Sequence, residues 1–322
     1  MKKKEPKYID IHSHINFKAF DEDRDEVIKR ALESDTWVIN VGTQLDTSRK
    51  AVEMANQYKE GVYAIIGLHP IHTGASYHDE KELGPAFAPA TPRLRRASKA
   101  SDGQGREEGF TSRGETFNKD SYRELLKDPK ANKKIVGIGE CGLDYYRMDE
   151  ESIERQKKNF IAQIELANEF NKPLMLHIRN NEPSSAEATA GEERKNAYVD
   201  ALVILKKHLD SQNLPAGRRG DVHFFAGTQE EAKSFLDFGF TLSFTGVITF
   251  TNDYDEVIKN TPLSMIMSET DAPYVTPEPY RGKRNEPMYV REVVRKIAKI
   301  KSLSEDEVAK AIIENAKRVF GI

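Results

Sequence analysis

Two histidines stand one residue apart in the apolar stretch YIDIHSHI, at His12 and His14. If this stretch is a β-strand, its side chains alternate between two faces, and Asp10, His12 and His14 point to the same side. Neutral imidazole is a good metal ligand, and two rings on one face can reach the same ion. The pair therefore suggests a metal site. The alternative is two structural histidines that are hydrogen-bonded to neighbouring carbonyl groups.

Further acids and imidazoles occur near the ends of other short apolar stretches. These residues are His69, Glu140, His177, His223 and Asp271. Up to 259 residues separate them from His12 (271 minus 12), so only the fold can bring them together. The elements that carry them decide whether they form one site.

Short apolar, β-branched stretches alternate with longer segments that have helical spacing, which is typical of repeated βα units and a parallel sheet. Eight strands are expected, at residues 8–15, 36–42, 62–70, 134–144, 173–179, 221–227, 240–246 and 264–273. Helices are expected at residues 23–33, 46–58, 150–171, 194–210, 228–238, 253–260, 286–300 and 304–319. Eight such units predict an α/β fold of the (β/α)8 TIM-barrel type in a single domain, 1–322.

Two polar segments interrupt this pattern. Residues 75–118 are rich in Gly, Pro, Ser and charge, and residues 180–196 form a shorter polar stretch. We interpret both as insertions in the loops that follow strands, because their composition cannot bury a core. The first is expected to be a mobile excursion over the catalytic side of the barrel.

The barrel prediction gives the polar residues a common position. Active sites of such barrels lie at the carboxyl ends of the strands. Acids and imidazoles at six strand ends would meet there, in about the number needed to hold two divalent ions with one carboxylate between them. We therefore expect a two-metal hydrolase in which the metal site activates a water molecule.

Composition limits the cellular context and the partners. The formal net charge of -3 gives no overall basic field, so a nucleic acid would have to be held locally. Cys141 is the only cysteine, which excludes an intramolecular disulfide and suits a reducing compartment. The N-terminal segment lacks the apolar region of a secretory signal, and no stretch is long enough to span a membrane. The expectation is a soluble cytoplasmic protein, and nothing in the sequence points to an obligate protein partner.

The segments DIHSH, GLHP, GECGLDYY, LHIR, HFFAG and SETDAPY, followed by RGKRNEP, resemble the motif series of the TatD-family metal-dependent deoxyribonucleases, a branch of the amidohydrolase-like barrels. The match runs from about Asp10 to Phe320 and omits only the insertions. The resemblance implies hydrolysis of DNA phosphodiesters with divalent ions, commonly magnesium or manganese and sometimes zinc. It also implies ligand sets: His12, His14 and Asp271 for one ion, His177 and His223 for the second, with Glu140 as the bridge. The stretch between GLHP and GECGLD is longer here than is usual in the family, which bears on substrate access.

Several residues near this site have a predicted role in catalysis or substrate binding. Asp271 would take the proton of the attacking water, and His69 would contact a phosphate or leaving group, or else orient a neighbouring ligand. Arg179 lies two residues beyond His177 and could pair with a phosphate, with a salt bridge at the barrel rim as the alternative. The basic loop, defined here as Arg281, Lys283 and Arg284, is expected to contact the phosphate backbone. Tyr145 and Tyr146 offer either a stacking surface for an unpaired base or ordinary barrel packing.

The resemblance to the TatD family, together with the basic loop, implies a DNA substrate, with single strands or frayed ends preferred and exonucleolytic cleavage. The first alternative is an amidohydrolase or lactonase that acts on small molecules. Many two-metal members of that group bridge their ions with a modified lysine at the end of strand 4, where this chain has Glu140. A second alternative, a binding protein that has lost catalysis, would be expected to lack one or more ligands, and none is missing.

Overall fold

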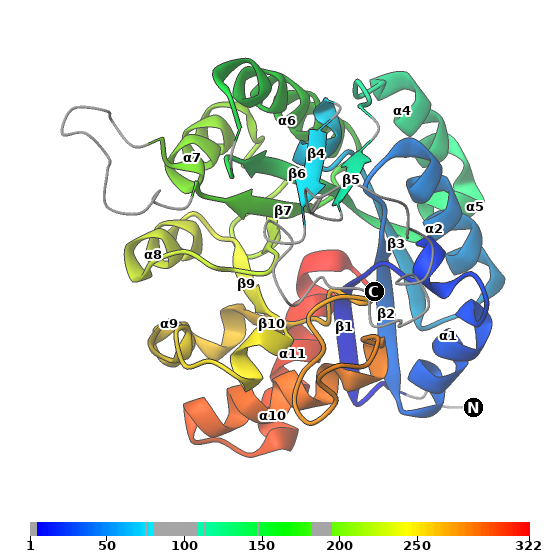
Figure 1. The fold of residues 1–322 in the computed structure, drawn as a ribbon, viewed down its shortest axis with the longest axis vertical. Helices are drawn as coiled ribbons and strands as arrows, with labels where there is room; N and C mark the ends of the chain where they lie inside the picture. Colours follow the sequence, from blue (N-terminus) through cyan, green and yellow to red (C-terminus); the bar gives the residue numbers. More distant parts are fainter. Residues whose placement is uncertain (1–4, 75, 80–108, 113, 147, 182–194) are drawn as a thin grey trace, which may run out of the picture.

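Eight parallel strands pair side by side in chain order in the computed structural model (Figure 1). The structure describes residues 5–74, 76–79, 109–112, 114–146, 148–181 and 195–322. The strands are β1 (Tyr8–Ser13), β2 (Thr36–Val41), β3 (Val62–Ile66), β6 (Ile135–Asp144), β7 (Leu174–Arg179), β8 (Gly220–Val222), β9 (Thr241–Phe244) and β10 (Ile266–Ser268). A bridge between Ser13 and Ala272 joins the first strand to the segment that follows the last one, so the barrel is nearly closed. The (β/α)8 prediction is confirmed.

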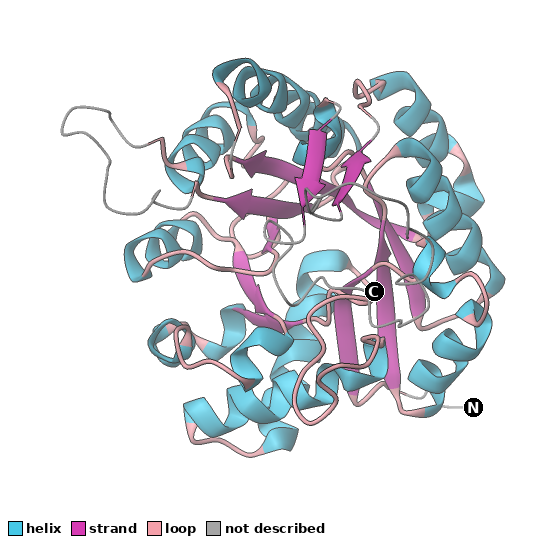
Figure 2. Cartoon of the chain, in the orientation of Figure 1, coloured by secondary structure: helices cyan, strands magenta, loops and turns pink. Residues whose placement is uncertain are grey.

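Helices surround the strands on the outside (Figure 2). They are α1 (Arg24–Glu33), α2 (Leu45–Gln57), α4 (Lys119–Lys127), α5 (Pro129–Asn132), α6 (Glu150–Phe170), α7 (Ala197–His208), α8 (Gln229–Asp237), α9 (Asp255–Asn260), α10 (Val290–Lys301) and α11 (Glu305–Phe320). Single turns of 3-10 helix lie between them: η1 (Lys18–Phe20), η2 (Pro70–Thr73), η4 (Gly246–Thr249), η5 (Leu263–Met265) and η6 (Pro287–Tyr289). Among the residues that the structure describes, no helix combines the length and apolar character that crossing a membrane requires.

All eight strands occur where the sequence predicts them, but most end earlier. Strands covered by helices on one side and by the barrel interior on the other are apolar on both faces, which is why they could be recognised. The last strand ends at Ser268 instead of residue 273. Asp271 therefore lies beyond the hydrogen-bonded ladder, in a left-handed backbone conformation with φ 54°.

The helix of the third βα unit, α4, was not expected from the sequence. Its side chains Tyr122 and Leu126 are four residues apart and buried against the barrel. The Tyr122 hydroxyl donates a hydrogen bond to the carbonyl oxygen of Gly67 at 3.0 Å, which ties the helix to the end of β3. The helix has few apolar residues and directly follows a long polar segment, so its helical spacing was not evident in the sequence.

Part of the first insertion forms a two-stranded hairpin. The strands β4 (Ser76–Asp79) and β5 (Gly109–Ser112) pair antiparallel. Most of the rest of this insertion, residues 75, 80–108 and 113, and most of the second, residues 182–194, lie outside the described residues. The expectation of a mobile excursion falls on these segments and stays a prediction.

Candidate metal centre

The two histidines of β1 and the loop after it face the barrel interior, as their alternation predicts. His12 and His14 are buried, and their Nε2 atoms lie 3.1 Å apart. The nearest oxygen of Asp271 lies 3.4 Å from the Nε2 atom of His14 and 3.9 Å from that of His12. Residues from the two ends of the chain thus meet at one point, because the first and last strands are neighbours in the barrel.

Glu140 occupies the centre of the cluster, and each of its carboxylate oxygens faces a different group of histidines. The Oε2 atom lies 3.3 Å from the Nε2 atom of His12 and 3.7 Å from that of His14. The Oε1 atom lies within 3.3 Å of a nitrogen of each of three other histidines: His177 (2.9 Å), His69 (3.2 Å) and His223 (3.3 Å). Five of the chain's eight histidines therefore surround one carboxylate.

The position of Glu140 depends on an irregularity in β6. The register between β6 and β7 shifts between Ile138 and Cys141, so Glu140 leaves the regular ladder. Gly142 has φ 140°, and a Cβ atom there would lie 2.1 Å from the carbonyl oxygen of His177. Only glycine fits this backbone conformation and this close approach. The GECG sequence is thus what allows the strand to turn a carboxylate into the site.

A second layer of hydrogen bonds fixes the orientation of the histidines. The Nδ1 atom of His14 lies 2.9 Å from the carbonyl oxygen of Val41, and that of His223 lies 2.9 Å from Glu269. A ring that donates its Nδ1 proton keeps the lone pair of Nε2 for a metal. Both Nε2 atoms face the centre of the cluster.

Three acids of this site carried no predicted role. Glu269 accepts hydrogen bonds from the backbone N–H of Phe224 (2.8 Å) and from the hydroxyl of Ser243 (2.8 Å), besides its contact with His223. Asp144 lies 2.9 Å from the Nε2 atom of His177. Asp10 accepts from the backbone N–H groups of His12 and Thr270 at 3.2 and 2.9 Å. Asp10 and Asp144 are acids in largely apolar strands, and that unusual placement is the signal that could have identified them, whereas Glu269 follows β10 in a polar segment.

Charge and burial perturb the groups of the cluster strongly. Burial would raise the pKa of Glu140, but the surrounding imidazoles, His69 first, hold it well below the usual value. Burial opposes the charged form of His223, yet Glu269 and Glu140 raise its pKa well above the ordinary range. For His69 burial dominates and lowers the pKa to about 4, so this ring is neutral at pH 7. Such perturbation is typical of functional sites.

The donor set suits divalent cations. Three overlapping groups of donors are present: His12, His14 and Glu140; His69, Glu140 and His177; and His12, His223 and Glu269. Within each group the ligand atoms lie within 4.8 Å of one another, and all of these residues except the partly exposed His177 are buried. The Nε2 atoms of His12 and His14 face each other at 3.1 Å, an arrangement that needs a proton or a cation between the two lone pairs. Imidazole nitrogens around a carboxylate are ligands that zinc, manganese and iron accept.

The predicted substrate contacts differ in their surroundings. The Arg179 guanidinium lies 3.8 Å from the ring centre of Tyr146. Tyr145 and Tyr146 are only 1% and 5% exposed, so they pack in the barrel and offer no stacking surface. Cys141 is buried as well, and burial raises the pKa of its thiol, in keeping with a packing role.

The three cations of the basic loop separate into two kinds. Arg284 donates to both carboxylate oxygens of Asp23, at 2.8 and 2.6 Å, and is thereby neutralised within the molecule. Lys283 is exposed, and within the described part of the chain neither it nor Arg281 has a carboxylate in ion-pairing distance. The buried amide of Asn285 holds the loop near Asp271 by donating to the carbonyl oxygens of Thr270 and Tyr274.

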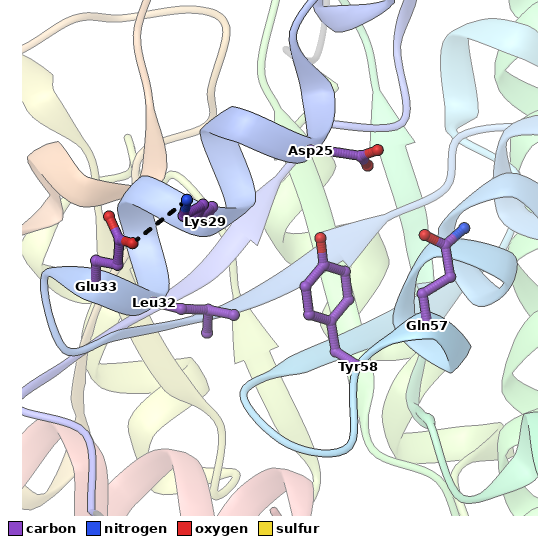
Figure 3. A pocket seen from close by; sticks show the side chains of 6 residues that line it. All are labelled: Asp25, Lys29, Leu32, Glu33, Gln57 and Tyr58. Carbon is purple, nitrogen blue, oxygen red and sulfur yellow. Dashed lines mark ion pairs between the residues drawn. The ribbon is translucent and has the colours of Figure 1, made fainter.

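A groove of about 580 Å³ lies elsewhere, on the helical exterior (Figure 3). Lys29 and Glu33 of α1 form an ion pair of 3.8 Å across part of it. Its lining consists of Asp25, Lys29, Leu32, Glu33, Gln57 and Tyr58. None of these residues belongs to the cluster around Glu140, and the groove has no comparable group of metal-binding side chains.

The chain is similar to known proteins over most of its length. A family model described as TatD related DNase matches residues 9–321. The uncharacterized metal-dependent hydrolase YabD of Bacillus subtilis is 33% identical over 316 residues, which cover 97% of this chain and 98% of that protein. The uncharacterized metal-dependent hydrolase YcfH of Escherichia coli is 34% identical over 201 residues, 62% of this chain and 68% of that protein.

Solved structures share the fold. The TatD homologue YjjV of Escherichia coli superposes with a TM-score of 0.71 at 24% identity, and the match covers 98% of both chains. A phosphotriesterase homology protein of Escherichia coli, complexed with phosphate in its active site, superposes with a TM-score of 0.53 at 12% identity over 99% of this chain and 100% of that one. The chain belongs to the TatD-related DNase family. It is a metal-dependent hydrolase with an amidohydrolase-like barrel.

Proposed function

We propose that the protein is a two-metal phosphodiesterase that acts on DNA. The observation that supports this proposal most directly is the position of Glu140, whose two oxygens face two separate groups of histidines. In this assignment His12, His14 and Asp271 hold one divalent ion, His177 and His223 hold the other, and Glu140 serves both. Magnesium, manganese and zinc are the candidate ions. The chemistry that such ions supply when bound is activation of water and stabilisation of negative charge on phosphate oxygens.

In this assignment Asp271 would receive the proton of the attacking water. Its carboxylate lies at the edge of the cluster, 3.4 Å from the Nε2 atom of His14, and remains slightly exposed. The left-handed backbone at this position is set by two hydrogen bonds: its N–H donates to the carbonyl oxygen of His12 at 2.9 Å, and its own carbonyl oxygen accepts from the N–H of Tyr274 at 2.9 Å. A carboxylate held in this way can serve as a base in one fixed position.

His69 is suited to donate a hydrogen bond to the substrate. Its Nδ1 atom accepts from the backbone N–H of Ile71 at 3.1 Å, so in the neutral ring the proton resides on Nε2. Burial keeps this ring neutral by lowering its pKa to about 4. The Nε2 proton points toward Glu140 at 3.2 Å, where a phosphate oxygen or a leaving oxygen could share it. We therefore assign His69 to substrate contact and not to metal binding.

The choice of DNA rests on the family and on the charges around the site. The matching family model is described as a DNase, and the similar phosphotriesterase homology protein holds phosphate in its active site. Arg281 and Lys283, in the loop that follows Asp271, supply positive charge for a phosphate backbone, and Arg179 follows His177 on β7. Charge of this kind is local, which is compatible with a net charge of -3.

The deciding experiment is hydrolysis of end-labelled single-stranded DNA, double-stranded DNA and RNA, read on a gel with and without EDTA. Metal content is measured on the same protein sample. We expect DNA cleavage that EDTA abolishes and that added magnesium, manganese or zinc restores. His12→Asn should lose this activity, whereas His208→Asn, a matched substitution at the end of α7, should keep it.

Two results would contradict the proposal. Intact DNA together with hydrolysis of amide or lactone substrates would assign the site to the amidohydrolase alternative. Cleavage that survives both EDTA and His12→Asn would show that the activity does not arise from this cluster.

A further inference from the structure

Phe250 is an exposed aromatic residue on the side of the barrel where the metal centre lies. It follows η4 in the loop after β9, and such loops form the catalytic face of a barrel. Its side chain is 42% exposed. Among the residues whose side chains the structure describes, it is the only exposed phenylalanine, tyrosine or tryptophan. A single exposed aromatic at a catalytic face calls for a functional explanation.

The loop that carries Phe250 is fixed to the loop that leaves Asp271. The Thr249 hydroxyl accepts a hydrogen bond from the N–H of Glu278 at 2.9 Å and donates one to the carbonyl oxygen of Gly246 at 2.6 Å. A Cβ atom at Gly246 would lie 2.2 Å from the carbonyl oxygen of Val275, so the two backbones approach as closely as glycine allows. Phe250 therefore has a defined position relative to the segment that carries Asp271.

Arg281 lies against the ring of Phe250. The centre of its guanidinium is 4.0 Å from the ring centre, and one of its N–H groups donates to the carbonyl oxygen of Thr276 at 2.8 Å. This distance is typical of a cation–π contact. Within the described residues no carboxylate pairs with Arg281, in contrast to Arg284, which Asp23 neutralises. The loop thus presents an uncompensated cation next to an exposed aromatic ring.

The ring of Phe250 and the guanidinium of Arg281 are complementary to the base and the phosphate of one unpaired nucleotide. A base can stack on an aromatic ring because every base has a π-face, and a guanidinium can bind the phosphate that follows the base. A base pair in a duplex stacks on its neighbours and does not expose its faces. Tyr145 and Tyr146, which follow β6, cannot stack on a base because both are buried.

We propose that Phe250 and Arg281 form a subsite for one unpaired nucleobase and its adjacent phosphate, in the loops that follow β9 and β10 on the catalytic side of the barrel. The proposal rests on the proposed action on DNA and assigns two residues to the expected preference for single-stranded segments and frayed ends. Phe250 provides the stacking surface, and Arg281 holds both the ring and the phosphate. The subsite reads no sequence, since stacking and phosphate contact are common to all nucleotides.

The test uses a fluorescent reporter at the subsite. Phe250→Trp keeps an aromatic ring there, and Trp37 is the only other tryptophan in the chain. The variant is mixed in a stopped-flow instrument with a single-stranded oligothymidylate, with an oligonucleotide of equal length whose sugars are abasic, and with a blunt hairpin duplex. Fluorescence should fall rapidly with the first oligonucleotide and change little with the other two. The wild-type protein, which retains Trp37 alone, corrects for any distant effect.

Steady-state kinetics of the metal-loaded enzyme provide the second measurement. Phe250→Ala should raise KM for single-stranded DNA by about tenfold, the typical effect of losing one stacked base, and leave kcat unchanged. Hydrolysis of bis(p-nitrophenyl) phosphate, which has no base, should also stay unchanged. Leu303→Ala removes another exposed apolar side chain, 38% exposed between α10 and α11, and should alter neither value.

The outcomes separate this proposal from the one on which it rests. Equal fluorescence changes with the base-bearing and abasic oligonucleotides, or an unchanged KM in Phe250→Ala, would overturn the subsite while leaving DNA cleavage intact. Failure of the wild-type protein to cleave any DNA would overturn the proposed function. The fluorescence comparison would still decide whether unpaired bases bind at Phe250.

Discussion

Replacement of Glu140 by glutamine tests the two-metal assignment most directly. The substitution keeps the size of the side chain and removes its charge. Each oxygen of Glu140 now faces a separate histidine group, at 3.3 Å on one side and 2.9 Å on the other. In glutamine one of these oxygens becomes an NH₂ group, which cannot bind a metal. One side chain could then no longer serve both ions.

The expected loss follows from the chemistry that the pair of ions supplies. Stabilisation of transition-state charge by such a centre is worth several kcal/mol, and each 1.36 kcal/mol corresponds to a factor of ten in rate. Glu140→Gln should therefore lower kcat on DNA by roughly a thousandfold, or about 4 kcal/mol. Bound metal should fall from two ions toward one per chain, as measured by inductively coupled plasma mass spectrometry. Circular dichroism should show an intact barrel.

A matched control removes a carboxylate elsewhere. Glu165→Gln changes an exposed glutamate on α6, whose partner is Lys119 at 3.0 Å, and should leave metal content and rate unaltered. If Glu140→Gln retained two ions and cleaved DNA at the normal rate, the dinuclear assignment would be wrong. The site would then be a mononuclear centre built on His12, His14 and Asp271.

Three further predictions follow from the surroundings of the site. Glu269→Gln removes the carboxylate that contacts His223 and should weaken the affinity for one of the two ions by about 10–100-fold in a chelator competition titration. A metal affinity equal to that of the wild-type protein would show that Glu269 has only a packing role. Replacing Arg281 and Lys283 together by Ala should raise KM for single-stranded DNA and reduce its salt dependence by about 1.4 in logarithmic slope, whereas Arg284→Ala should leave KM unchanged and lower the free energy of unfolding by about 1 kcal/mol. Burial raises the pKa of Asp221 from 3.8 to about 7, so the native state keeps a proton that the unfolded chain releases. The free energy of unfolding should therefore fall as pH rises from 3.8 to about 7, by up to about 1.4 kcal/mol per pH unit. In urea unfolding with chelator present, Asp221→Asn should show a weaker pH dependence than the wild-type protein. An equal pH dependence in both proteins would refute this prediction.

The barrel could be predicted from the sequence because its strands obey a simple physical rule. A strand that is covered on both faces must be apolar throughout, so a polar residue at its end stands out. His12, Glu140 and His223 were singled out as candidate ligands in this way. The ends of the strands were less certain, since a buried apolar residue such as Ala272 continues the pattern after the ladder has ended.

Residues that support the ligands were harder to predict. Glu269 stands between Ser268 and Thr270, and its position in the sequence does not reveal that it faces His223, 46 residues earlier. Its role depends on the pairing of β8, β9 and β10 in the barrel. Asp144 is the last residue of β6, and its role becomes clear only when β7 places His177 beside it. Partners on neighbouring strands require the register, which a single sequence does not provide.

The predicted substrate contacts were uncertain for a different reason. The sequence shows which residues are charged, but it does not show which of them form ion pairs within the protein. Arg281 and Arg284 lie three residues apart in one loop, and from the sequence both are equivalent phosphate ligands. The fold brings Asp23, 261 residues away in the chain, to Arg284 and leaves Arg281 beside Phe250. Nothing in the sequence marks Phe250 either, since a phenylalanine between apolar and polar residues is usually buried. The proposed metal ligands lie on or close to strands whose ends can be recognised, whereas the proposed base subsite depends on how two loops pack against each other. Exchange of the loop between β9 and α9 with that of a relative should therefore change the preference for single-stranded DNA without changing the metal content.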